Sequence, residues 1–228
     1  MNNKYKAVIF DLFHTLTSAN SVNAPGRETA DILGVSQEQW NAQIFNYSND
    51  RLTGKNKDAY EIVREMAHVI NPAITEDTIK EATESRVRRF NYALINIDPK
   101  VQEVLKKVEK LNILMGLLSN ADVQEVSAWD QSPIKYLFDS VVFSCDVGFV
   151  KPQAEIYEIS LKQLGVKPDE VLFVGDGGCD ELKGAQEVGI KTVLMTEFIK
   201  KLWPEKIIAR RQYADYEIDD LKKLLDII

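Results

Sequence analysis

Short, almost continuous apolar runs recur along the chain and predict β-strands. Five of them are rich in Val, Ile, Leu and Phe, and a sixth, at 214–218, is weaker. The five stronger runs are KAVIF (6–10), ILMGLLS (113–119), SVVFS (140–144), VLFVG (171–175) and KTVLM (191–195). Strands that are apolar throughout, rather than alternately apolar and polar, are typical of a parallel sheet covered on both faces.

Amphipathic helical patterns lie between these runs. In 99–111, valine and leucine recur three and four residues apart, and 154–166 repeats this form with Gly165 as its stop. Strand and helix therefore alternate along most of the chain. This alternation predicts an α/β core in which helices cover both faces of a parallel sheet.

The stretch 18–94 differs, because it holds several helical patterns and no convincing strand. Segment 58–70 carries its apolar residues on one face, and 75–90 begins with acids and finishes with arginines, as the helix dipole favours. We therefore predict a core of residues 1–17 and 95–228 with an inserted helical cap, 18–94. Ligands bind at the carboxyl ends of the strands in open parallel sheets, so the cap would close over them.

Composition and charge narrow the classes of partner. Hydrophobic residues make up 45% and charged residues 28%, and the net charge is −7. This balance fits a globular protein and argues against a nucleic-acid or anionic-membrane binder, although a local site can still hold a small anionic substrate. No apolar run is long enough for a secretory signal or a membrane span. With two cysteines at no metal-type spacing, we expect free thiols and a cytoplasmic location. The expected oligomeric state is a monomer or a homodimer.

Polar residues follow each of the first four predicted strands, and parallel strands bring their carboxyl ends to one edge. In chain order they are Asp11, Ser119 with Asn120, Lys151, and Asp176 with Asp180. Each has a plain structural explanation when taken alone, such as a helix cap for Asp11 or Asp180 and a turn for Ser119. Together they gather a nucleophile, a hydroxyl, a lysine and two further acids at one place.

These segments resemble the four signatures of the haloacid dehalogenase-like hydrolase superfamily, in the group with a helical cap after the first strand. FDLFHTL, LLSN, VGFVKP and VGDGGCDEL match them in order, and the resemblance covers essentially the whole chain. It implies a three-layer, Rossmann-like parallel-sheet core with an all-helical cap. It also implies a hydrolase that forms a covalent intermediate on an aspartate.

The resemblance further implies a role for each matching residue. Asp11 would be the nucleophile, and Lys151 would neutralise the clustered carboxylates and the transferring group. Ser119 and the loop amides after Asp11 would hold phosphate oxygens, and Asn120 and Thr15 complete the predicted catalytic set. The implied cofactor is Mg²⁺, which prefers oxygen ligands. Its predicted ligands are Asp11, the backbone carbonyl of Phe13 and Asp176, with Asp180 nearby.

Phe13 departs from the family pattern, since the phosphatases of the family carry an aspartate there as general acid and base. A phenylalanine keeps the carbonyl but cannot transfer a proton, which is worth roughly 10²–10⁴-fold in rate. A metal-dependent phosphatase acting on a small phosphorylated metabolite is the leading hypothesis. The alternatives are a 2-haloacid dehalogenase-like or phosphonatase-like enzyme, the latter with Lys55 of the cap as a weak candidate, and a non-catalytic binding protein on a hydrolase fold.

Overall fold

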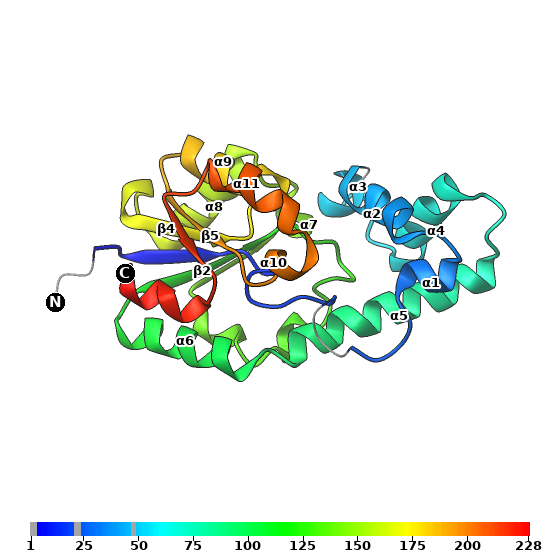
Figure 1. Cartoon of the computed structure of the whole chain (residues 1–228), viewed down its shortest axis with the longest axis horizontal. Coiled ribbons are helices and arrows are strands. Elements are labelled where there is room, and N and C mark those ends of the chain that lie inside the picture. The colour runs from blue at the N-terminus through cyan, green and yellow to red at the C-terminus, as the bar shows by residue number, and fades with distance from the viewer. Residues whose placement is uncertain (1–3, 21–23, 47–48) are drawn as a thin grey trace.

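The structure is a computed structural model that describes residues 4–20, 24–46 and 49–228. It is an elongated molecule with an α/β core at one end and a group of helices at the other (Figure 1). These helices are inserted between the first and second strands. The predicted fold class, a parallel-sheet core with a helical cap, is therefore confirmed.

The core contains one sheet of six parallel strands in the order β3-β2-β1-β4-β5-β6. The strands are β1 (Ala7–Phe10), β2 (Leu114–Ser119), β3 (Ser140–Phe143), β4 (Val171–Gly175), β5 (Lys191–Met195) and β6 (Tyr216–Ile218). Each falls within one of the six apolar runs. The order places the carboxyl end of β1 between those of β2 and β4. The chain adds β2 and β3 on one side of β1, and then β4, β5 and β6 on the other.

Eleven α-helices accompany the strands in the part of the chain that the structure describes, the first five of them in the cap. They are α1 (Thr29–Leu33), α2 (Gln37–Asn46), α3 (Asn49–Leu52), α4 (Ala59–Ile70), α5 (Glu76–Ile95), α6 (Pro99–Lys110), α7 (Ser144–Val147), α8 (Ala154–Leu164), α9 (Glu181–Glu187), α10 (Ile199–Leu202) and α11 (Ile207–Arg211). Gly165 ends α8 with a φ of 68°, as its place after the apolar pattern predicts.

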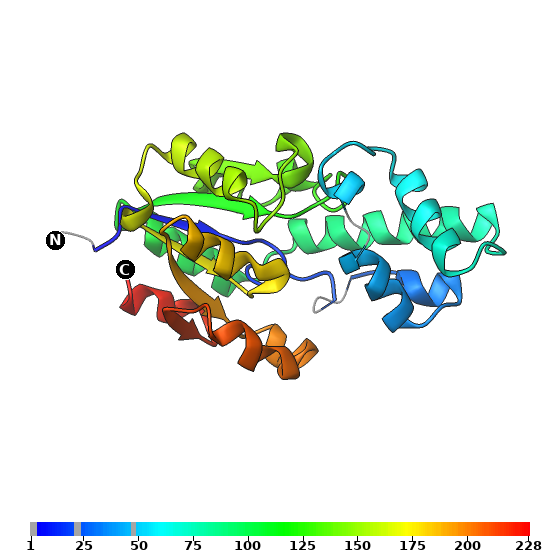
Figure 2. The same ribbon diagram turned by 90° about the horizontal axis from the view of Figure 1, so that it is seen from above.

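Two apolar layers bury the two faces of the sheet. Val8 and Phe10 of β1 pack in one cluster with α6, whereas Ala7 and Ile9 pack in the other with α8 and α9. Figures 1 and 2 show α6 on one side of the sheet and α8 and α9 on the other. The strands are thus apolar on both faces, which is why their sequences lack alternation.

The cap has an apolar cluster of its own, and α5 joins it to the core. Ile79 of α5 belongs to the cap cluster with Trp40 and Ile62, whereas Leu94 of the same helix is buried in the core cluster. The helical pattern in the sequence stops near Phe90, but the helix continues to Ile95 because its last turn packs on the core. A 20-residue helix spans about 30 Å, so α5 connects the two parts.

No helix within the described ranges could span a membrane. The longest of them, α5, carries acidic and basic residues from Glu76 to Arg89.

A loop of the cap is seated directly on the core at Gly54. A Cβ atom added at this glycine would lie 2.0 Å from the carbonyl oxygen of Cys145, and the φ of the glycine is +69°. Cys145 lies in α7, directly after β3. Gly34 has almost the same φ, +67°, but nothing lies within 4 Å of its added Cβ atom. The two glycines therefore share a backbone requirement and differ only in the contact with the core.

We predict that Gly54→Ala destabilises the protein more than Gly34→Ala does. Both variants place a side chain at positive φ, which costs roughly 1 kcal/mol, and only the first also pushes the cap loop away from Cys145. Urea unfolding should show a free energy of unfolding lower by at least about 1 kcal/mol for Gly54→Ala than for Gly34→Ala. Equal losses would mean that the close contact does not hold the cap in place.

Candidate active site

A buried lysine joins two carboxylates at the carboxyl edge of the sheet. The Nζ atom of Lys151 lies 2.6 Å from Oδ1 of Asp11 and 2.5 Å from Oε2 of Glu181. All three side chains are buried. Asp11 directly follows β1, Lys151 lies in the loop between α7 and α8, and Glu181 begins α9, so this contact ties together three separate parts of the core.

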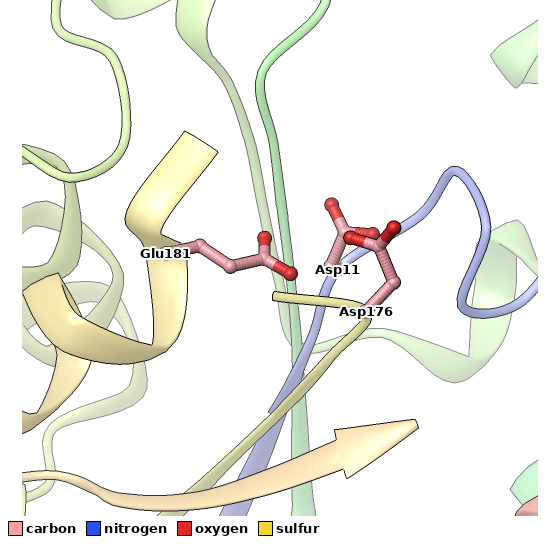
Figure 3. A group of neighbouring side chains, drawn as sticks. All are labelled: Asp11, Asp176 and Glu181. Carbon is pink, nitrogen blue, oxygen red and sulfur yellow. The ribbon is translucent and has the colours of Figure 1, made fainter. Parts of the chain in front are cut away.

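A third carboxylate, Asp176, completes an acidic cluster with Asp11 and Glu181. Each of the three offers an oxygen, and these oxygens all lie within 4.8 Å of one another. In Figure 3 the carboxylates of Asp11 and Asp176 lie side by side, and Glu181 is directed toward them from the start of α9. Asp176 is oriented by the backbone N–H of Gly178 at 2.8 Å and by Nη1 of Arg210, which donates to Oδ2 at 2.7 Å.

Burial and the nearby charges shift the pKa values of the groups in this cluster. Burial raises the pKa of Asp11, although the charge of Lys151 opposes the shift. Burial and the nearby charge of Asp11 raise the pKa of Glu181 to about 8. Burial disfavours the charged form of Lys151, but attraction to Asp11 and Glu181 outweighs it and raises the pKa of the amine. The lysine therefore stays protonated, and the cluster favours additional positive charge.

Three more residues of the predicted catalytic set lie around Asp11 and Lys151. Oγ1 of Thr15 donates a hydrogen bond to Oδ2 of Asp11 at 2.9 Å. The side chain of Asn120 donates to the carbonyl oxygen of Lys151 at 3.0 Å and accepts from its N–H at 2.7 Å, which fixes the backbone of the lysine. Ser119 is buried, and its Oγ atom has no hydrogen-bond partner among the described residues. A buried hydroxyl in this state is suited to a ligand oxygen.

Phe13 and His14 follow Asp11 and line the cavity above it. The ring of Phe13 packs edge-to-face on Phe90 of α5, with ring centroids 5.2 Å apart. His14 adopts a φ of 64°, and its ring lies 4.9 Å from that of Trp203. Burial lowers the pKa of His14, so the imidazole is neutral near neutral pH. Phe13 thus places an apolar ring at the position where the resemblance implies an acid.

The acid that joins the cluster after β4 is Glu181, whereas the sequence pointed to its neighbour Asp180. Cys179 and Asp180 both have positive φ, and this turn leaves Asp180 exposed at the start of α9, without a side-chain capping bond. Glu181 then points inward. The signal for it is Gly175, since a Cβ atom there would lie 2.2 Å from the Glu181 carboxylate. Arg210 carried no sequence signal, because it arrives from α11, 34 residues after Asp176.

The cap contributes two buried arginines that pair with a loop of the core. Nη1 of Arg51 lies 2.7 Å from Oδ2 of Asp122, and Arg86 of α5 is hydrogen-bonded to Glu125. Both arginines line the cavity over Asp11. In contrast, Lys55 is 73% exposed, pairs with Asp50 at 3.5 Å and does not line that cavity.

We predict that, without added metal, the protein loses stability between pH 7 and pH 8 because of Glu181. With a pKa raised from 4.5 to about 8, this carboxyl keeps its proton in the folded state while the unfolded chain has already released it. Unfolding then releases a proton, so a rise in pH favours unfolding by about 1 kcal/mol over this interval. His14 does not contribute there, since its pKa is lowered from 6.5.

Urea unfolding in a chelating buffer at the two pH values measures this loss. The Glu181→Gln variant is the control, because it cannot titrate and should show a smaller difference. The same pH dependence in both proteins would contradict the assignment to Glu181.

Comparisons with known proteins identify the family. The sequence model of the family of haloacid dehalogenase-like hydrolases matches residues 5–189 of this chain. A glyceraldehyde 3-phosphate phosphatase of Methanocaldococcus jannaschii is 25% identical over 98% of this chain and 96% of its own length. (S)-2-haloacid dehalogenase 4A of Burkholderia cepacia is 27% identical over 85% of this chain and 84% of its own.

A solved structure places the fold in the same group. That of L-2-haloacid dehalogenase from Xanthobacter autotrophicus aligns with a TM-score of 0.65 at 19% identity, over 98% of both chains. At this identity the likeness concerns the fold alone. With the family match over most of the chain, it follows that this protein belongs to the haloacid dehalogenase-like hydrolases and is a hydrolase of that family.

Proposed function

We propose that the protein is a Mg²⁺-dependent phosphatase that transfers a phosphoryl group to Asp11 and then to water. The observation that carries this proposal is the cluster of Asp11, Asp176 and Glu181 around the amine of Lys151. Phosphoryl transfer depends mainly on positioning and on the stabilisation of charge, and these groups supply both. The relative from Methanocaldococcus jannaschii is named a phosphatase, which supports the same reaction class.

The acidic cluster is suited to a small divalent cation. All three side chains offer carboxylate oxygens, which Mg²⁺ prefers. When all three carboxylates are ionised, Lys151 and Arg210 bring two positive charges to them, so one negative charge is left that a divalent ion would offset. The proposed ligands are Asp11, Asp176, Glu181 and the backbone carbonyl of Phe13, and Asp180 stays a predicted outer contact. Bound Mg²⁺ would stabilise the negative charge on the phosphoryl oxygens in the transition state.

Each of the site residues has a distinct part in the proposed reaction. An oxygen of Asp11 attacks phosphorus and the bond to the leaving oxygen breaks, while Thr15 holds the other carboxylate oxygen in place. Lys151, fixed by Asn120, stabilises the charge on the phosphoryl oxygens. Ser119 donates its unpartnered hydroxyl to one of these oxygens. Water then attacks phosphorus, which releases phosphate and restores Asp11.

The haloacid dehalogenase alternative rests on one observation, the apolar ring at Phe13. Halide leaves without a proton, so a missing general acid costs such an enzyme nothing, and the relative from Burkholderia cepacia is named a dehalogenase. Against it, Asp176 and Glu181 bring two more carboxylates to Asp11. These would repel the carboxylate of a haloacid.

Two further alternatives have less support. A phosphonatase-like reaction with Lys55 as the cap lysine has little support, since this side chain is exposed and away from the cavity. A protein that only binds has no use for a buried cluster of Asp11, Lys151, Asp176 and Glu181, which is costly to bury. The oligomeric state and the cytoplasmic location stay predictions from the sequence.

The proposed function predicts metal-dependent release of phosphate. A panel of acetyl phosphate, sugar phosphates and an aryl phosphate is incubated with Mg²⁺ or with chelator, and phosphate is measured. Asp11→Asn keeps the shape of the side chain but removes the nucleophile, and it should lower the rate by at least about 10³-fold.

The matched control is Asp169→Asn, the same substitution at an exposed position just before β4, at the opposite edge of the sheet. It should leave the rate unchanged. Release of halide from 2-chloropropionate, with no phosphate release from any ester, would overturn the phosphatase proposal in favour of the dehalogenase alternative.

A further inference from the structure

A cavity of about 490 Å³ lies over Asp11, and both the cap and the core line it. Pockets of this size bind small organic molecules, and a phosphoryl group fills only a small part of such a volume. The rest must accommodate the group that leaves when phosphate is transferred. The side chains around that part of the cavity therefore indicate the chemistry of the leaving group.

Five phenylalanine and tryptophan side chains line the cavity, as two edge-to-face pairs and one further ring. They are Phe13 with Phe90, Phe45 with Trp203, and Trp40. The first pair has ring centroids 5.2 Å apart at 86°, and the second 6.2 Å apart at 84°. Arg86 lies over the ring of Phe90, and Lys206 lies over the rings of Phe45 and Trp203. The rings also line the cavity, where their apolar surface suits another aromatic ring.

The second pair bridges the cap and the core. Phe45 lies near the end of α2 in the cap, and Trp203 follows α10 in the core (Figure 1). Phe45 is 49% exposed although its ring lines the cavity, so much of its apolar surface faces water. Exposed apolar surface is unfavourable in water, and a bound apolar group would remove that cost.

The positive charges of the cavity already have carboxylate partners. Arg51 pairs with Asp122, Arg86 with Glu125, Arg89 with Glu28 and Arg210 with Asp176. A second anionic group on the substrate, such as a carboxylate or another phosphate, would have to compete with these acids. The charges therefore favour a leaving group that is uncharged.

Phe13 sets a further condition, because no acid at this position can protonate the leaving oxygen. A phenol is a far stronger acid than an alkyl alcohol, so its anion leaves without help. The rings, the paired arginines and the missing acid thus point to one kind of substrate.

We propose that the substrate is a phosphate monoester of a neutral aromatic alcohol, with its ring against Phe45 and Trp203; this rests on the phosphatase function proposed above. The bond from phosphorus to the aryl oxygen breaks, the aryloxide leaves with the electron pair and takes a proton from water. Water then attacks the phosphorus on Asp11, and the products are the free phenol and inorganic phosphate.

The test compares phenyl phosphate with 1-naphthyl phosphate, using acetyl phosphate as the small reference. Phenol and 1-naphthol are acids of similar strength, so the two aryl esters differ mainly in apolar area. The value of kcat/KM should be about threefold to tenfold higher for the naphthyl ester, through a lower KM. Acetyl phosphate has a good leaving group without a ring, and its hydrolysis reports the phosphatase function by itself.

Phe45→Ala should remove the naphthyl advantage, and because this side chain is already half exposed the variant is expected to fold. Phe45→Tyr should restore it. Tyr136→Ala is the matched control, since this tyrosine is 84% exposed and does not line the cavity, and it should keep the naphthyl advantage in full.

Two results would overturn the inference in different ways. If acetyl phosphate is hydrolysed but the two aryl esters have equal kcat/KM, or Phe45→Ala keeps the naphthyl advantage, the aromatic substrate class is wrong and the phosphatase function stands. If none of these three phosphorylated compounds is hydrolysed with Mg²⁺ present, both proposals fail.

Discussion

The site depends on the contact of one buried ammonium group with two buried carboxylates. Lys151 lies between Asp11 and Glu181, and without it these acids, once both are ionised, would repel each other in a medium of low polarity. The parallel sheet makes the contact possible, since β1 ends between β2 and β4 and every following loop reaches the same edge. The fold therefore brings the charges together, and Lys151 allows them to stay buried.

Phe13 is the second constraint, because it keeps the backbone of the signature and removes its acid. Its ring joins Phe90 of the cap helix α5 in the wall of the cavity. The cap also brings Arg51 and Arg86 there, but both are paired with acids of the core loop after β2. The cap therefore adds apolar surface to the cavity while its charges hold it on the core. An apolar cavity wall and the absence of an acid at Phe13 both favour, under the proposed function, an apolar leaving group that needs no proton.

The strands and the order of the site residues could be predicted from the sequence, since buried parallel strands are apolar throughout and their loops share one edge. Two features could not. The left-handed turn at Cys179 and Asp180 decides that Glu181 points inward, and adjacent acids cannot be distinguished by spacing. The wall formed by Phe45 and Trp203 joins positions 158 residues apart, so neither local periodicity nor a motif marks it.

The central claim is that Asp11 accepts the phosphoryl group. Because Phe13 offers no base to activate water, the aspartyl-phosphate should break down more slowly than it forms from a reactive acyl phosphate. Protein quenched in acid during turnover of acetyl phosphate with Mg²⁺, then digested and analysed by mass spectrometry, should carry one phosphoryl group on Asp11. Continued turnover with an unmodified Asp11 peptide would contradict the account.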